Sequence, residues 1–81
     1  MANTFHLVVA SVGETKFDGQ AISATLPGAS GEFTVLAHHE PVVSILKKGT
    51  VTVKEAQDGQ KKFEIESGVI EVSNNRAIVL L

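Results

Sequence analysis

The 81-residue sequence contains no cysteine, no tryptophan and no tyrosine, and only two prolines. Without cysteine, the chain has no disulfide, no thiolate nucleophile and no cysteine-based zinc site. Without tryptophan or tyrosine, it offers little of the exposed aromatic platform that a carbohydrate- or peptide-binding sandwich would use. A free-standing binding module is therefore a weaker functional alternative, which the sequence leaves open.

Long apolar runs are also absent. The longest, Leu7–Ala10 and Ala77–Leu81, are far shorter than the roughly 20 residues that span a bilayer. No basic stretch followed by an apolar core opens the sequence, so no secretory signal is expected. Seven Lys and Arg residues against nine Asp and Glu residues give a net charge of −2, and the two signs are interleaved. The composition predicts one globular domain, residues 1–81, with no membrane insertion and no nucleic-acid partner.

Valine, isoleucine and threonine are abundant, and the seven glycines separate short runs of residues. Four segments alternate apolar and polar residues with the period of a half-buried strand: 4–9, 21–26, 50–54 and 62–66. Asp58-Gly59 lies at the centre of a predicted hairpin turn, and Ser73–Arg76 is the polar tip of a second hairpin. No segment has helical periodicity with caps. The sequence therefore predicts an all-β fold of two layers, a sandwich or a flattened barrel.

The predicted core contains the residues that best satisfy the two-residue period or that mark the centres of apolar runs. These residues are Phe5, Leu7, Val9, Ile22, Leu26, Val35, Val53, Phe63, Ile65, Val72 and Val79. If Phe63 is central, its truncation to alanine should cost roughly 3–5 kcal/mol.

Two motifs invite a ligand-binding hypothesis. Pro27–Phe33 has two glycines that could let backbone N–H groups approach a phosphate, but it lacks the Gly-Lys-Ser/Thr ending and a following helix, so a tight turn is favoured. His38-His39-Glu40 combines metal-ligand types, but adjacent strand side chains point to opposite faces and only His6 could add a nitrogen ligand. One histidine is expected to pack and the other to face solvent or a partner. Since no Gly-x-Ser-x-Gly motif is present either, no catalytic residue, metal or cofactor is predicted.

A series of motifs in a fixed order carries a family resemblance. The most specific part runs from Pro27-Gly28-Ala29-Ser30-Gly31-Glu32-Phe33 to His39-Glu40-Pro41. The other motifs are Phe5-His6-Leu7, Phe17-Asp18-Gly19, Lys48-Gly49, Ser67-Gly68-Val69-Ile70-Glu71-Val72 with Asn75, and Ile78-Val79-Leu80. With these motifs, the sequence from about Phe5 to Leu81 resembles the N-terminal domain of the epsilon subunit of F-type ATP synthases.

The sequence departs from the family pattern in three places. Ala37-His38 stands where the family usually has Pro-Gly or Pro-Asn, so the resemblance does not fix the conformation of that loop. Ser67-Gly68 replaces a Gly-Gly pair. The C-terminal helical hairpin that family members commonly carry, and that inhibits ATP hydrolysis, has no counterpart in these residues.

The resemblance implies a two-layer antiparallel β-sandwich of roughly ten strands at the foot of the rotor. It implies a non-catalytic subunit that links the gamma subunit to the c-ring and supports the coupling of proton flow to ATP synthesis. It also implies a peripheral position at the cytoplasmic face of the bacterial inner membrane, or at the thylakoid stromal face for a plastid protein. No small-molecule substrate is implied.

The positions of this sequence that match the family pattern give a set of partner contacts implied by the resemblance. They are Ser11, Gly28, Ala29, Ser30, Gly31, Glu32, His38, His39 and Ser44. The resemblance places the Gly28–Glu32 tip against the c-ring, where Glu32 could meet basic groups of the c-ring loops through charge-assisted hydrogen bonds. It places Ser11, His39 and Ser44 near the gamma subunit or the ring.

Overall fold

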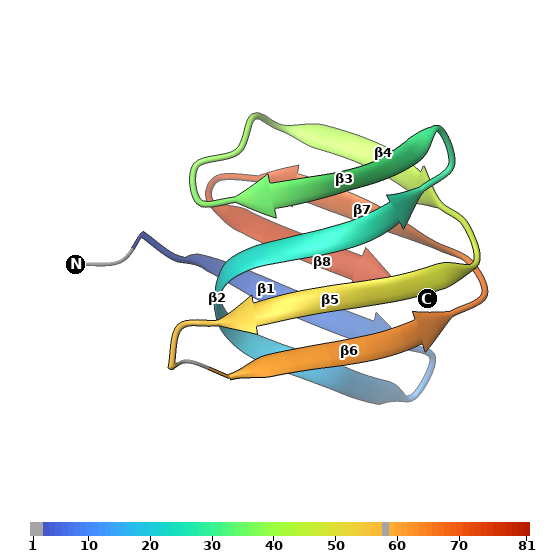
Figure 1. Ribbon diagram of the computed structural model, residues 1–81, viewed down its shortest axis with the longest axis horizontal. Coiled ribbons are helices and arrows are strands. Elements are labelled where there is room, and N and C mark those ends of the chain that lie inside the picture. Colours follow the sequence, from blue (N-terminus) through green and yellow to red (C-terminus); the bar gives the residue numbers. More distant parts are fainter. Residues whose placement is uncertain (1–2, 58) are drawn as a thin grey trace.

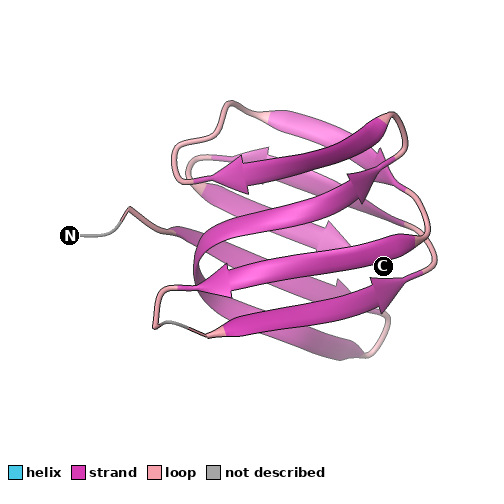
Figure 2. Ribbon diagram, viewed as in Figure 1, coloured by secondary structure: helices cyan, strands magenta, loops and turns pink. Residues whose placement is uncertain are grey.

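The computed structural model describes residues 3–57 and 59–81, and none of these residues is helical (Figure 2). The strands are β1 (Phe5–Ser11), β2 (Glu14–Gly28), β3 (Gly31–Leu36), β4 (Val42–Leu46), β5 (Gly49–Glu55), β6 (Gln60–Ile65), β7 (Gly68–Ser73) and β8 (Arg76–Leu80). The all-β prediction is confirmed, with eight strands in place of roughly ten. Part of the difference is β2, which runs as one continuous strand of 15 residues.

The strands form two packed layers (Figure 1). One layer contains β4, β7, β8, β1 and the first half of β2; the other contains β3, the second half of β2, β5 and β6. β2 belongs to both layers because its residues 14–21 pair with β1, whereas residues 21–28 pair with β5 and β3. The pairings are antiparallel except for β1 with β8, which is parallel. The strand β2 therefore ties the two layers together covalently.

The core between the layers confirms most of the predicted residues. The fully or nearly fully buried ones are Phe5, Leu7, Val9, Leu26, Val35, Val53, Ile65, Val72 and Val79. Phe63 also packs against this cluster but is only partly buried, so it is a peripheral member of the core and not a central one.

Ile22 was wrongly predicted as a core residue, because the alternation of β2 breaks at this point. The register of β2 against β5 shifts between Ala21 and Ser23. An extra residue of this kind, a β-bulge, changes which side chains face inward. Ala21 and Ala24 are both buried as a result, while Ile22 is only partly buried.

The predicted turns connect neighbouring strands. Asn74 and Asn75 join β7 to β8 with φ values of 50° and 58°, as a two-residue type I′ hairpin requires. The tip between β2 and β3 is also a tight turn, since Gly28 pairs with Gly31. A Cβ atom on Gly28 would lie 2.6 Å from the carbonyl oxygen of Gly31, so this close approach requires glycine. The hairpin of β5 and β6 is present, whereas Asp58 of its predicted turn lies outside the described residues.

The strand directions place the connections at two opposite ends (Figure 1). We call the end that carries residues 28–31 the tip end; it also holds the β1–β2 turn, the β4–β5 connection and the C-terminus, at the right of the figure. We call the end that carries residues 37–41 the loop end; it also holds the β7–β8 turn and the start of β1. The described residues contain no helix long and apolar enough to cross a membrane.

Candidate interaction surfaces

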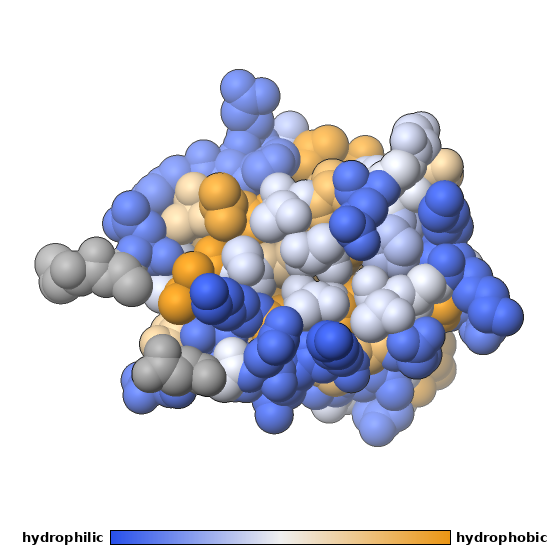
Figure 3. Space-filling model, viewed as in Figure 1, coloured by the Kyte–Doolittle hydropathy of each residue, from blue (hydrophilic) through white to orange (hydrophobic). Residues whose placement is uncertain are grey.

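The outer face of the layer β3-β2-β5-β6 is mainly polar, with Leu36 at the end of β3 as an exposed apolar exception. Thr25 and Thr34 share a hydrogen bond between their hydroxyl groups at 3.0 Å, and Thr50 donates to a carboxylate oxygen of Glu64 at 2.6 Å. Lys54 and Lys62 are exposed, as expected for the solvated face of a hairpin. Figure 3 shows this face with a weakly polar centre, hydrophilic residues along the bottom and the right, and a few hydrophobic side chains at the left and the top.

The outer face of the other layer is largely apolar where β4, β7, β8 and β1 form it. The strand registers place Val8, Ile78, Glu71 and Val43 in one cross-strand row, and Ala10, Leu80, Val69 and Ile45 in the next. We call the seven apolar members of these rows the apolar face. Its exposed fractions reach 67% at Val43 and 66% at Ile45. Because contiguous exposed apolar side chains mark interaction sites, this face is the main candidate for binding a partner.

Sequence analysis did not predict the apolar face, although a signal was present. A strand with one wet face alternates apolar and polar residues, but Leu7–Ala10 and Ala77–Leu81 are apolar throughout. In a two-layer fold only one side of such a strand can face the core. Every second residue of these runs therefore lies on the outer face.

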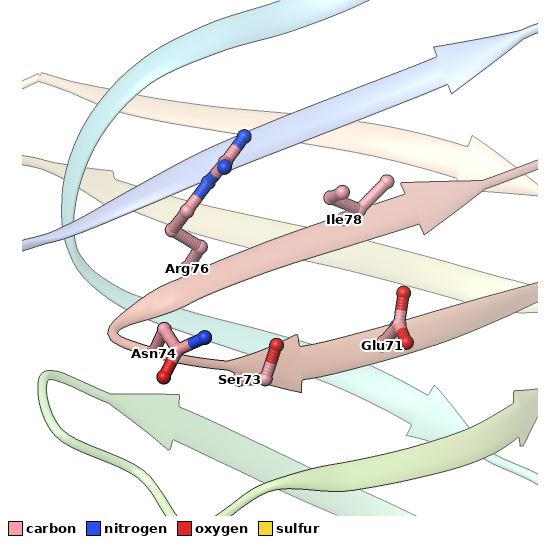
Figure 4. A pocket seen from close by; sticks show the side chains of 5 residues that line it. All are labelled: Glu71, Ser73, Asn74, Arg76 and Ile78. Carbon is pink, nitrogen blue, oxygen red and sulfur yellow. The ribbon is translucent and has the colours of Figure 1, made fainter.

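A small hollow opens at the loop end of the apolar face (Figure 4). It has a volume of about 90 Å³ and is lined by Glu71, Ser73, Asn74, Arg76 and Ile78. Within the part of the chain that the structure describes, neither Glu71 nor Arg76 forms an ion pair. The hollow therefore presents one free acidic and one free basic group to a partner that covers this face.

The described residues include no group of three or more histidine and acidic side chains that could hold a metal ion. His38 and His39 differ in exposure, as predicted, since His38 is exposed and His39 is half-buried. His39 donates from Nδ1 to the carbonyl oxygen of Glu40 at 2.8 Å. His6 instead approaches Asp18 on the neighbouring strand, with its Nε2 atom 2.6 Å from a carboxylate oxygen.

The predicted partner contacts are divided between the two ends. Ser11 and the segment Gly28–Glu32 lie at the tip end, whereas His38 and His39 lie at the loop end. β3, with six residues, separates them, which corresponds to about 20 Å of extended chain. Ser44 lies between the ends, half-buried in the middle of β4. One small contact cannot include all of these residues.

Taken together, the fold and its surfaces define a β-sandwich domain with one apolar and one polar outer face. The family model described as "ATP synthase, Delta/Epsilon chain, beta-sandwich domain" matches residues 4–81. The chain therefore belongs to this family, and the resemblance found in its motifs is confirmed.

Individual relatives agree with this assignment. The "ATP synthase epsilon chain" of Bordetella avium is 36% identical over 77 residues, which is 95% of this chain and 55% of the relative. The protein of the same name from Rhodopseudomonas palustris is 39% identical over 77 residues, covering 95% and 56% of the two chains. This chain thus spans about half the length of these relatives.

A solved structure shows the same fold. A chain of the Euglena gracilis mitochondrial ATP synthase, determined with OSCP, F1 and the c-ring, superposes with a TM-score of 0.87 at 22% identity. The match covers 99% of this chain and 51% of that one.

Proposed function

We propose that this chain acts in the central stalk of an F-type ATP synthase, as a non-catalytic element that connects the gamma subunit to the c-ring and supports the coupling of proton flow to ATP synthesis. The names of its relatives support this proposal. The observation that carries it is the one-sided apolar face. A sandwich that acted alone in water would gain nothing from four strands with apolar outer side chains.

The apolar face is the proposed binding surface for the gamma subunit. A stable interface covers about 800 Å² of each partner, which is roughly one sixth of the 5013 Å² surface of this chain. The four strands β4, β7, β8 and β1 provide a broad surface of this kind. The most exposed side chains, those of Val43 and Ile45, lie on β4 and are the proposed anchors.

The tip end is the proposed contact for the c-ring. Backbone hydrogen bonds hold the tip against β4: the amide of Ala29 donates to the carbonyl of Ile45 at 2.8 Å, and the amide of Lys47 donates to the carbonyl of Pro27 at 2.9 Å. Val12, which is 100% exposed in the β1–β2 turn, adds an apolar side chain at the same end. A tip braced in this way can transmit force between two partners at different places on one domain.

The proposed function gives the domain a peripheral position at the membrane, with its tip end directed toward the ring. For a bacterial enzyme, the position is the cytoplasmic face of the inner membrane. The binding is then entirely to other subunits, and no lipid contact is required.

Glu32→Lys tests the tip end. Glu32 is exposed, so we expect the free energy of unfolding to change by no more than about 0.5 kcal/mol. If Glu32 meets basic groups of the c-ring, the reversed charge replaces attraction by repulsion. We expect proton-driven ATP synthesis by the reconstituted enzyme to fall severalfold while gamma binding by the chain is retained.

Lys54→Glu is the matched control, because it also reverses one exposed charge, but near the end of β5 that lies opposite the tip end. Like Glu32→Lys, it should change the free energy of unfolding by no more than about 0.5 kcal/mol. Normal coupling with Glu32→Lys, or an equal loss with Lys54→Glu, would rule out the tip as the c-ring contact.

A further inference from the structure

The side chain of Asn75 joins three segments at the loop end. Its Oδ1 atom accepts a hydrogen bond from the backbone N–H of His38 at 2.8 Å. Its Nδ2 atom donates to the carbonyl oxygen of Thr4 at 2.9 Å. Its own carbonyl accepts from the N–H of His6 at 3.2 Å. The β7–β8 turn is thereby connected to both the β3–β4 loop and the start of β1.

The β3–β4 loop needs such a contact because of its backbone conformation. The N–H of His39 donates to the carbonyl of Leu36 at 3.2 Å, which closes a four-residue turn. The third residue of the turn, His38, has a φ of 62°, a left-handed conformation that glycine and asparagine adopt more readily than histidine. The bond that closes the turn does not use the N–H of His38, and Asn75 supplies the acceptor for it.

Asn75 itself fits this role without disturbing its own turn. Its φ of 58° is the left-handed value that a type I′ hairpin requires, and asparagine tolerates that value well. One residue therefore satisfies the turn geometry with its backbone and holds a second loop with its carboxamide. Asn74, with a φ of 50°, shares the turn geometry, and its side chain makes no hydrogen bond among the described residues.

We infer that Asn75 is a positioning residue that holds the segment His38–Glu40 in the conformation presented to a partner. The positioning of the loop stands on the hydrogen bonds alone. The expected effect of this positioning on gamma binding rests on the proposed function, because the effect requires the β3–β4 loop to lie beside the gamma contact. A positioning role differs from a general stabilising role, because loss of Asn75 should then change the conformation of one loop while the packing of the core stays the same.

Three variants of the turn separate the possibilities, and a fourth, in the core, controls for general destabilisation. Asn75→Gly keeps the left-handed turn but removes both side-chain bonds, and Asn74→Gly is the matched control in the same turn. Asn75→Asp keeps an oxygen acceptor for His38 and loses the donor to Thr4. The readouts are hydrogen exchange of the His38 amide in the chain alone and the rate of its dissociation from purified gamma subunit.

For Asn75→Gly we expect the His38 amide to exchange about tenfold faster and dissociation from gamma to be several times faster. Asn74→Gly should change neither rate. Compared with Asn75→Gly, Asn75→Asp should exchange the His38 amide more slowly and dissociate from gamma more slowly. A general loss of stability would not produce this recovery. Val79→Ala, which destabilises the core, should leave the His38 exchange near its original rate.

Unchanged His38 exchange in Asn75→Gly would overturn the positioning role, whatever happens to gamma binding. Faster exchange with unchanged dissociation would overturn the claim that the loop affects gamma binding. Gamma binding by the apolar face is tested separately, by Ile45→Asp. The positioning role of Asn75 and the proposed function can therefore fail independently.

Discussion

Replacing Phe5 by alanine should lower the free energy of unfolding by about 3–5 kcal/mol. Phe5 is 1% exposed and is among the largest fully buried side chains, so the substitution removes a complete aromatic ring from the core. A domain of this size has a total stability of only about 5–10 kcal/mol. We expect chemical denaturation to show a midpoint that falls by at least about a third, and thermal unfolding to begin near room temperature.

Phe63→Ala is the natural comparison, because it removes the same side chain from the edge of the core. Phe63 is only partly buried, so we expect its truncation to cost roughly half as much. If the two variants were equally destabilised, or if Phe63→Ala were the worse one, the assignment of Phe5 to the centre of the core would be wrong.

Ile45→Asp should weaken binding to the gamma subunit by about a hundredfold or more, which corresponds to about 2.7 kcal/mol. Ile45 is 66% exposed in the free chain, so the substitution changes little of the folded core. In the complex, the new carboxylate would be buried against an apolar partner surface without a cation to pair with it. Binding of the purified chain to gamma, measured by calorimetry, gives the affinity directly.

Thr34→Asp is the matched control for this variant. It adds the same charge to an exposed strand position, on β3 in the polar layer. Both variants should lower the free energy of unfolding by no more than about 1 kcal/mol, and only Ile45→Asp should lose affinity. Equal affinity for the two variants would mean that gamma does not bind the apolar face.

The sequence contains most of the information that determines the core, and the exceptions have a local cause. Phe5, Leu7 and Val9 follow the two-residue period, and all three are buried. Ile22 follows the same period, but a bulge beside it changes the alternation. A bulge depends on pairing with β5, about thirty residues further along the chain, and no local pattern predicts it.

The candidate site was less predictable for a different reason. The apolar face exists only because the pairings of β4, β7, β8 and β1 bring side chains from distant segments together. The resemblance drew attention to the tip and to the histidines, which the structure places at opposite ends. The left-handed His38 and its bond to Asn75 are likewise properties of the fold, since 37 residues separate them in the chain.

The central claim, that gamma covers the apolar face and leaves the polar face free, can be tested by cysteine labelling. The sequence has no native cysteine, so Val43→Cys on the apolar face and Lys62→Cys on the polar face each provide a single reactive thiol. Both side chains are exposed in the free chain, and both variants should react quickly with a soluble maleimide. In complex with gamma, we predict that labelling of the Val43→Cys variant slows by roughly tenfold or more while that of Lys62→Cys is unchanged. Unchanged labelling of Val43→Cys, or protection of Lys62→Cys instead, would contradict the account.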